Sequence, residues 1–238
     1  ELARMAECTP PDFRFVLKAH ASVTTPFRQF ARLAAIRPDV DHFLDPAHAI
    51  ERIIAPAVEG LGSRLGVLLF QFPPLGYTTR DLHEFPVRLG RFLEQLPRGP
   101  QYAVEVRNRE VLGESYADAL ARSGVTHCFN VYPRMPDVLA QAQLVGESAW
   151  LSGAVVVRWV LHPEQDYEAA RERFFPFHKL ADPDAKSRSA VAELLETLLA
   201  RGSEVFVIAG NKAEGCAPLT LFTLAKELDR RCQPQPQG

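Results

Sequence analysis

The regular alternation of strand patterns with helix patterns constrains the fold of this 238-residue chain more than any other feature. Six short apolar segments are typical of buried strands, and the stretches between them carry apolar residues three or four positions apart, as on one face of a helix. In parallel α/β architecture this alternation gives right-handed βαβ units, in a doubly wound sheet or in a (β/α)8 barrel. The strands are expected at residues 13–20, 65–72, 101–108, 126–132, 154–162 and 204–209.

Capping residues and prolines mark the expected helices. Asp45, which stands before a proline, predicts a helix start, and Thr79 is expected to cap another helix. Pro56 and Pro86 lie inside helical patterns, so each is expected to bend or interrupt its helix. Residues 133–150 are expected to form an irregular connection with one or two helical turns.

A barrel is the favoured form of this alternation. No GxGxxG, GKT or GKS motif follows the first strand, which argues against nucleotide-binding doubly wound folds. A barrel needs eight strands, whereas six are legible here and the chain opens on what reads as the end of a helix. We therefore expect a TIM-type (β/α)8 barrel whose first one or two βα units are absent from this sequence. A single domain over residues 1–232 and a disordered tail at 233–238 are expected.

Composition narrows the functional classes. Hydrophobic residues make up 47% of the chain, enough for a large core, and the net charge of −2 gives no general attraction to nucleic acid or anionic lipid. The four cysteines form no CxxC pair, which argues against a zinc cage or a disulfide scaffold. No apolar run approaches the ~20 residues of a membrane span, and residues 1–13 do not resemble a signal peptide. We expect a cytoplasmic protein without membrane contact.

Strand parity indicates where a site would form. In a barrel every second strand residue points inward, and the carboxyl ends of the strands build the site. We assign one parity to each strand so that the inward set begins apolar and ends polar. The expected inward sets are Val16, Lys18, His20; Val67, Leu69, Gln71; Ala103, Glu105, Arg107; Cys128, Asn130, Tyr132; Val156, Arg158, Val160, His162; and Val205, Val207, Ala209, Asn211.

The polar ends of these sets are cationic, with Lys18, Arg107 and Arg158 against the carboxylate of Glu105. Guanidinium groups suit phosphate and carboxylate, so a small anionic or phosphorylated ligand is the expected partner. Backbone N–H groups at residues 211–215, before the last helix, are expected to cradle the same anion. The expected ligand-binding residues are Arg107, Arg158, Gln71, Asn130, Asn211, Lys212 and Glu214.

Glu105 and Lys18 are the expected catalytic residues, with the carboxyl group as acid or base and the amine as Schiff-base, general-acid or phosphate-binding group. The alternative is that Glu105 and Arg107 form a structural ion pair. His20 and His162 are candidate metal ligands together with Glu105. Because only one carboxylate lies among the inward positions, no metal or other cofactor is expected, and a divalent metal is the alternative.

Several motifs resemble a known family. RFVLKAH with Thr24-Thr25, LLFQFPP, YAVEVRN, VVVRW and NKAEGCAP are similar to segments of the YecE-like family, the domain of unknown function numbered 72. The resemblance implies a TIM barrel whose opening strands this sequence lacks. It marks as recurrent positions Lys18, Gln71, Glu105, Arg107, Arg158, Asn211 and Glu214. This sequence departs from the family pattern at Asn108, Gly210 and Thr220. The family has no settled activity, so the resemblance implies fold and site location alone.

Two classes of function stay open. The first is an enzyme of hydrolase or isomerase type that acts on a phosphorylated or otherwise anionic substrate at the strands' carboxyl ends. The alternative is a non-catalytic protein that binds RNA, DNA or an anionic metabolite, in which Glu105 only orients the arginines. Residues 163–188 mix aromatic and basic side chains, as a lid or a nucleic-acid surface does, or form an ordinary solvated connection.

Overall fold

The computed structural model of the chain describes residues 1–26, 41–76 and 78–233. The expected disordered tail, residues 233–238, lies outside the described residues except for Gln233. Within the described part, no helix is both long and apolar enough to cross a lipid bilayer.

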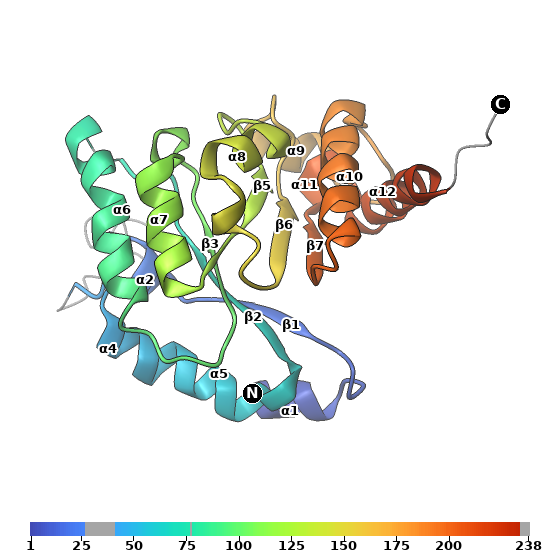
Figure 1. Cartoon of the computed structure of the whole chain (residues 1–238). Helices are drawn as coiled ribbons and strands as arrows, with labels where there is room; N and C mark the ends of the chain where they lie inside the picture. Colours follow the sequence, from blue (N-terminus) through green and yellow to red (C-terminus); the bar gives the residue numbers. More distant parts are fainter. Residues whose placement is uncertain (27–40, 77, 234–238) are drawn as a thin grey trace.

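The chain has an α/β fold with parallel sheets (Figure 1). One sheet has the strand order β1-β2-β3-β4 and the other β5-β6-β7, and every pairing is parallel. The strands are β1 (Phe15–Lys18), β2 (Leu65–Gln71), β3 (Tyr102–Glu105), β4 (Thr126–His127), β5 (Phe129–Val131), β6 (Val155–Trp159) and β7 (Val205–Ala209). All six expected strand segments are confirmed, and the fourth is divided into β4 and β5.

The division falls at Cys128, where the strand changes its partner. Its first half pairs with β3 up to the partners Val104 and His127, and its second half pairs with β6 from the partners Phe129 and Val157. The backbone N–H of Cys128 still donates to the Val104 carbonyl at 2.8 Å. Residues 126–131 therefore connect the two sheets.

Helices alternate with the strands as expected. Figure 1 shows α6, α7, α8 and α10 side by side along the strands. The α-helices are α1 (Leu2–Glu7), α2 (Ala21–Thr24), α4 (Pro46–Ala49), α5 (Ala55–Leu61), α6 (Thr79–Leu93), α7 (Glu114–Ser123), α8 (Val138–Val145), α9 (Tyr167–Phe174), α10 (Ala185–Ala200), α11 (Asn211–Glu214) and α12 (Ala217–Cys232). Shorter turns are the π-helical η1 (Ile50–Ile54) and the 3-10 segments η2 (Gly62–Arg64), η3 (Arg109–Val111) and η4 (Glu147–Ala149).

The capping and proline predictions have mixed outcomes. Asp45 caps α4 as expected. Thr78, and not Thr79, caps α6, because Thr78 and Asp81 form a reciprocal capping box. The pattern around Pro56 is interrupted by the π-helical turn η1, since proline has no N–H to continue the α-helical bonds. Helix α6 continues through Pro86.

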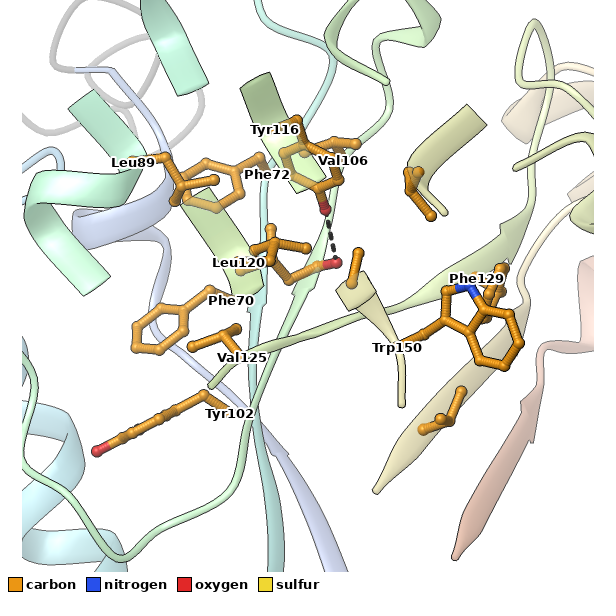
Figure 2. Close-up of a cluster of buried hydrophobic side chains, with 14 of the residues drawn as sticks. Phe70, Phe72, Leu89, Tyr102, Val106, Tyr116, Leu120, Val125, Phe129 and Trp150 are labelled. Carbon is orange, nitrogen blue, oxygen red and sulfur yellow. Dashed lines mark hydrogen bonds between the residues drawn. The ribbon is translucent and has the colours of Figure 1, made fainter. Parts of the chain in front are cut away.

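The larger core lies between the strands and the helices. In the first five expected strands its side chains come from the parity opposite to the expected inward sets, and they pack on the apolar faces of the helices (Figure 2). Phe70 of β2 packs edge to face on Phe92 of α6, and Phe72, which directly follows β2, packs in the same way on Phe85 of α6. Burying these apolar surfaces contributes most of the stabilisation of the helix layer.

A second, smaller core lies on the other face of the strands. It contains Val67, Leu69, Ala103, Cys128, Ala154 and Val156, with Val16, Phe206 and Ile208 packed against it. The inward parity is therefore confirmed for Val16, Val67, Leu69, Ala103, Cys128 and Val156. It is wrong for β7, where Phe206 and Ile208 face this core, while Val205 and Val207 pack against the larger one.

The register explains this correction. Phe206 is the parallel partner of Val156, and Ile208 is the partner of Arg158, so each pair shares a face. The β7 sequence VFVIA is apolar at every position, so alternation carried no signal there. The ring of Phe206 also reaches β2, because a Cβ added at Gly66 would lie only 2.8 Å from its Cζ atom. The two sheets thus curve toward each other around the smaller core.

Candidate functional site

Four polar side chains stand at paired register positions near the carboxyl ends of parallel strands. Gln71 of β2 is the register partner of Glu105 of β3, and Asn130 of β5 is the partner of Arg158 of β6. Partners in parallel strands share a sheet face, here the face of the smaller core. The register therefore shows which of these residues share a face, whereas their grouping in a binding site stays a prediction.

Glu105 is the centre of an ion cluster, with 0% of its side chain exposed. Arg107 Nε donates to Glu105 Oε1 at 2.9 Å, and Arg158 Nη1 donates to Glu105 Oε2. The two arginine side chains are 14% and 16% exposed. Two cations against one anion leave the cluster with one positive charge, and burial limits the water that screens it.

Both arginines keep donors beyond those that Glu105 uses. Within residues 1–26, 41–76 and 78–233, the terminal nitrogens of Arg107 and the Nε and Nη2 atoms of Arg158 make no hydrogen bond. Since a guanidinium has five N–H groups in a planar fork, the carboxylate fixes the orientation of each fork and leaves one edge available. Each guanidinium therefore keeps N–H groups that no described residue accepts.

Arg107 also connects the cluster to a cleft. Its guanidinium lies over the ring of Tyr132, 4.2 Å from the centroid. Both residues line a cleft of about 610 Å³, a size typical of small-ligand sites. The other lining residues are Pro74, Leu75, Asn108, Arg109, Glu110, Pro133, Arg134, Leu161, Pro163, Glu164, Gln165, Asp166 and Tyr167.

Asn108, one of the departures from the family pattern, holds the cleft wall. Its Oδ1 accepts the backbone N–H of Leu75 at 2.6 Å, and its Nδ2 donates to the Leu75 carbonyl at 3.2 Å. The side-chain amide thus pairs with the loop after β2 as a strand backbone would. This contact fixes the loops that follow β2 and β3 relative to each other.

A buried polar network lies beside the cluster and was not found from the sequence. Gln141 of α8 accepts the backbone N–H of Asn130 at 3.1 Å and donates to its carbonyl at 2.7 Å. Its amide thereby takes the place of the backbone hydrogen bonds that would join Asn130 to β3 if the pairing of β3 and β4 continued beyond His127. Asn130 Nδ2 donates to the Val106 carbonyl at 2.9 Å, which bridges the same gap, and Gln141 Oε1 lies 3.3 Å from His127 Nε2. A glutamine within a segment expected to be irregular gave no signal of this role.

Burial sets the protonation of two groups in this region. It lowers the pKa of His127 to about 4, with the Gln141 hydrogen bond opposing the shift, so the imidazole is neutral at pH 7. Burial also raises the pKa of the Cys128 thiol well above its ordinary value, and the Glu105 charge adds to the shift. Both groups are therefore neutral, and the Cys128 thiol lies within the electrostatic reach of Glu105, Arg107 and Arg158.

Lys18, Asn211 and Lys212 lie apart from the cluster in their contacts. Lys18 ends the edge strand β1 and is exposed. Asn211 Oδ1 accepts the backbone N–H of Ala217 at 2.9 Å, at the start of α12. Lys212 Nζ lies 4.2 Å from the ring centroid of Tyr167, at the edge of the cleft. Their catalytic and ligand-binding roles stay predictions.

Glu214 is fully buried in a separate ion pair. Arg188 Nη2 and the backbone N–H of Asp184 both donate to its Oε1, the latter at 2.7 Å. Its carbonyl accepts the N–H of Ala181 at 2.7 Å. In the described structure none of these hydrogen bonds reaches the Glu105 cluster. The geometry is that of a residue that anchors the start of α10.

Two N–H groups of the expected backbone cradle at 211–215 are engaged within the loop itself. The N–H groups of Ala213 and Gly215 donate to the carbonyls of Gly210 and Asn211. Gly210 is required by close packing, because a Cβ there would lie 2.8 Å from the Val160 carbonyl oxygen. This explains the glycine at a position where the family pattern differs.

The candidate metal ligands do not converge. In the described part of the chain, no group of three or more His, Cys, Asp and Glu side chains is placed to hold a metal ion. His20 Nδ1 lies 3.0 Å from the Ser22 hydroxyl, and His162 Nδ1 accepts the backbone N–H of Glu164 at 3.2 Å. Neither contact involves Glu105.

Comparison with known proteins places this geometry in a family. The family model described as "Protein of unknown function DUF72" matches residues 1–238. A solved DUF72 protein from Thermotoga maritima MSB8 is 22% identical, with a TM-score of 0.59 over 95% of this chain and 77% of its own. Another from Enterococcus faecalis V583 is 17% identical, with a TM-score of 0.61 over 96% and 83%. No curated protein matches the chain. At these identities the solved structures establish likeness of fold.

Proposed function

The chain belongs to the DUF72 family, and we propose that it binds a phosphorylated or otherwise anionic small ligand through Arg107 and Arg158. The observation that carries the proposal is the convergence of two guanidinium groups on the one buried carboxylate of Glu105. A buried carboxylate is neutralised by one such partner, so the second leaves a net positive charge at a protected site. An anion that accepts the remaining N–H groups would balance that charge.

Glu105 acts in this proposal as the group that orients both arginines. Both of its oxygens are engaged, and proton transfer to a substrate would require one guanidinium to move away. Catalysis of hydrolase or isomerase type is the second candidate. It is favoured by the position of Glu105 at the carboxyl end of a parallel strand, where barrel enzymes hold their reacting groups. In that case Lys18 would serve as a second catalytic group.

The same proposal includes the TIM-type barrel. Residues 126–131 join both sheets, and the ring of Phe206 on β7 reaches Gly66 on β2 across the smaller core. Strands that curve this far suit a barrel wall, with the arginine cluster at its carboxyl-terminal mouth.

The ligand is best sought in the protein as purified. Native mass spectrometry of protein prepared without phosphate, sulfate or chelator should detect a bound anionic species, and Arg158→Ala should lose it. Arg201→Ala is a matched control, because Arg201 pairs at the surface with Glu147. A species retained equally by wild type and Arg158→Ala would refute the proposal.

Thermal unfolding with added inorganic phosphate gives a second measurement. Ligand that binds the folded state alone raises stability by mass action, so phosphate at 100 times its dissociation constant adds about 2.7 kcal/mol. The proposal predicts this rise for wild type and Arg201→Ala, and its loss in Arg158→Ala. Glu105→Gln separates the two candidates, since an enzyme would lose turnover of a captured ligand, whereas a binder would chiefly change affinity.

A further inference from the structure

We propose that the anion at Arg107 is the phosphate of a nucleoside monophosphate whose sugar and base occupy the 610 Å³ cleft. This inference rests on the proposed anion-binding function and names the substrate class. The cleft is lined by Arg107 and Tyr132 and also by Tyr167, the first residue of α9. Its volume lies in the range of sites for ligands of drug size, far beyond what a phosphate group needs.

The cleft walls offer aromatic surface for a planar group. Tyr167 is 54% exposed although it is a large aromatic residue, and Lys212 Nζ stands 4.2 Å from its ring centroid. Tyr132 carries Arg107 over its own ring at 4.2 Å. Nucleobases stack on aromatic side chains irrespective of sequence, because every base has a π-face. The exposed ring of Tyr167 therefore offers a planar base a stacking surface within the cleft lining.

The charge balance separates a mononucleotide from a nucleic-acid strand. The cleft lining carries three cations, Arg107, Arg109 and Arg134, and three anions, Glu110, Glu164 and Asp166. A balanced lining offers no net attraction to a polyanion, whose binding depends on an excess of basic groups. A ligand with one phosphate and several hydroxyl groups can pair its phosphate with the arginines and donate its hydroxyl protons to the carboxylates.

Glu164 is placed to accept the sugar hydroxyls. It lines the cleft, and its carboxylate makes no hydrogen bond or ion pair with any described residue. Asp166 is less available, because its Oδ1 accepts the backbone N–H of Ala169 at 2.8 Å as the cap of α9. Carboxylates that bind ribose hydroxyls are a recurring feature of nucleotide sites in parallel α/β folds. The lining thus supplies a partner for each part of a nucleoside monophosphate.

Calorimetric titration of the full chain tests the inference with four probes: AMP, UMP, ribose 5-phosphate and inorganic phosphate. We expect AMP and UMP to bind at least about tenfold more tightly than ribose 5-phosphate, as base stacking on an aromatic ring predicts. Tyr167→Ala should remove this difference and leave the affinity for ribose 5-phosphate unchanged. Tyr167→Phe, which keeps the ring, should bind AMP as the wild type does.

The outcomes separate this inference from the function on which it rests. If ribose 5-phosphate binds and depends on Arg107, but AMP and UMP bind no more tightly, the anion site stands and the mononucleotide is refuted. Equal losses for all probes in Tyr167→Ala would refute it as well. If no phosphate compound binds, both proposals fail. Tighter binding of oligo(dT) than of AMP, with steep salt dependence, would assign the cleft to single-stranded nucleic acid instead.

Discussion

The ion cluster predicts a large and specific cost for removing Arg158. Arg158→Met keeps most of the side-chain volume but leaves Glu105 Oε2 buried without its partner. Breaking a buried ion pair costs ~3–5 kcal/mol, because an uncompensated charge remains. Arg107 still neutralises Glu105, and the Arg158 site is 16% exposed, so water replaces part of the lost contact. We therefore expect about 3 kcal/mol.

Urea unfolding and thermal unfolding measure this cost directly. For a domain of this size ~3 kcal/mol corresponds to a fall in Tm of roughly 6–12 °C. Arg201→Met is the matched control, since its pair with Glu147 is solvent-exposed on both sides and should contribute little to stability. Equal stability losses in the two variants would show that Arg158 carries no buried charge.

Combining the two substitutions separates the energy of the Glu105–Arg158 ion pair from the packing energy of the Arg158 side chain. Glu105→Gln removes the negative charge that Arg158 compensates, so Arg158→Met should cost less in that background. We expect the double variant to be at least ~1 kcal/mol more stable than the sum of the two single losses predicts. Strict additivity would refute the argument that Glu105 is the charge that makes Arg158 necessary.

Three further predictions concern the surroundings of the site. His127 has a folded-state pKa of about 4 against an ordinary value of 6.5, so its contribution is complete above pH 6.5. The free energy of unfolding falls by roughly 3 kcal/mol on this account as the pH drops to 4. Urea unfolding at pH 7 and pH 4.5 measures the loss of stability between the two pH values, which should be smaller in His127→Gln than in wild type. Gln141→Leu leaves the backbone N–H of Asn130 buried without an acceptor and should cost ~2–4 kcal/mol, against a negligible change for Gln143→Leu on the exposed side of α8. Glu214→Gln should lower stability through the loss of its ion pair with Arg188, while phosphate affinity stays that of the wild type; a selective loss of affinity would restore Glu214 to the ligand site.

Local pattern was sufficient to predict the strands and most of their faces. Glu105 and Arg107 lie two residues apart in an extended segment, so they had to share a face wherever the strand was placed. The alternation in β2 and β3 likewise separated the two cores, because each strand carries side chains of different size or polarity on its two faces.

Long-range register decided what local pattern left open. VFVIA in β7 is apolar on both faces, so only its pairing with β6 showed which of its residues face the smaller core. The cap of α6 shifted by one residue to Thr78 because Asp81 completes the reciprocal bonds. Glu214 was expected at the ligand site, yet its partner Arg188 lies in another helix and holds it in a separate pair.

The sequence alone determined an alternating α/β chain with a cationic set of residues at the strand ends, because side-chain periodicity is a property of neighbouring residues. Only the tertiary structure decided that Arg158, 53 positions away, shares the Glu105 carboxylate with Arg107. It also decided that Gln141 fills the gap between β3 and β5. Such contacts depend on the register and curvature of the strands, and the packing of the whole fold sets both.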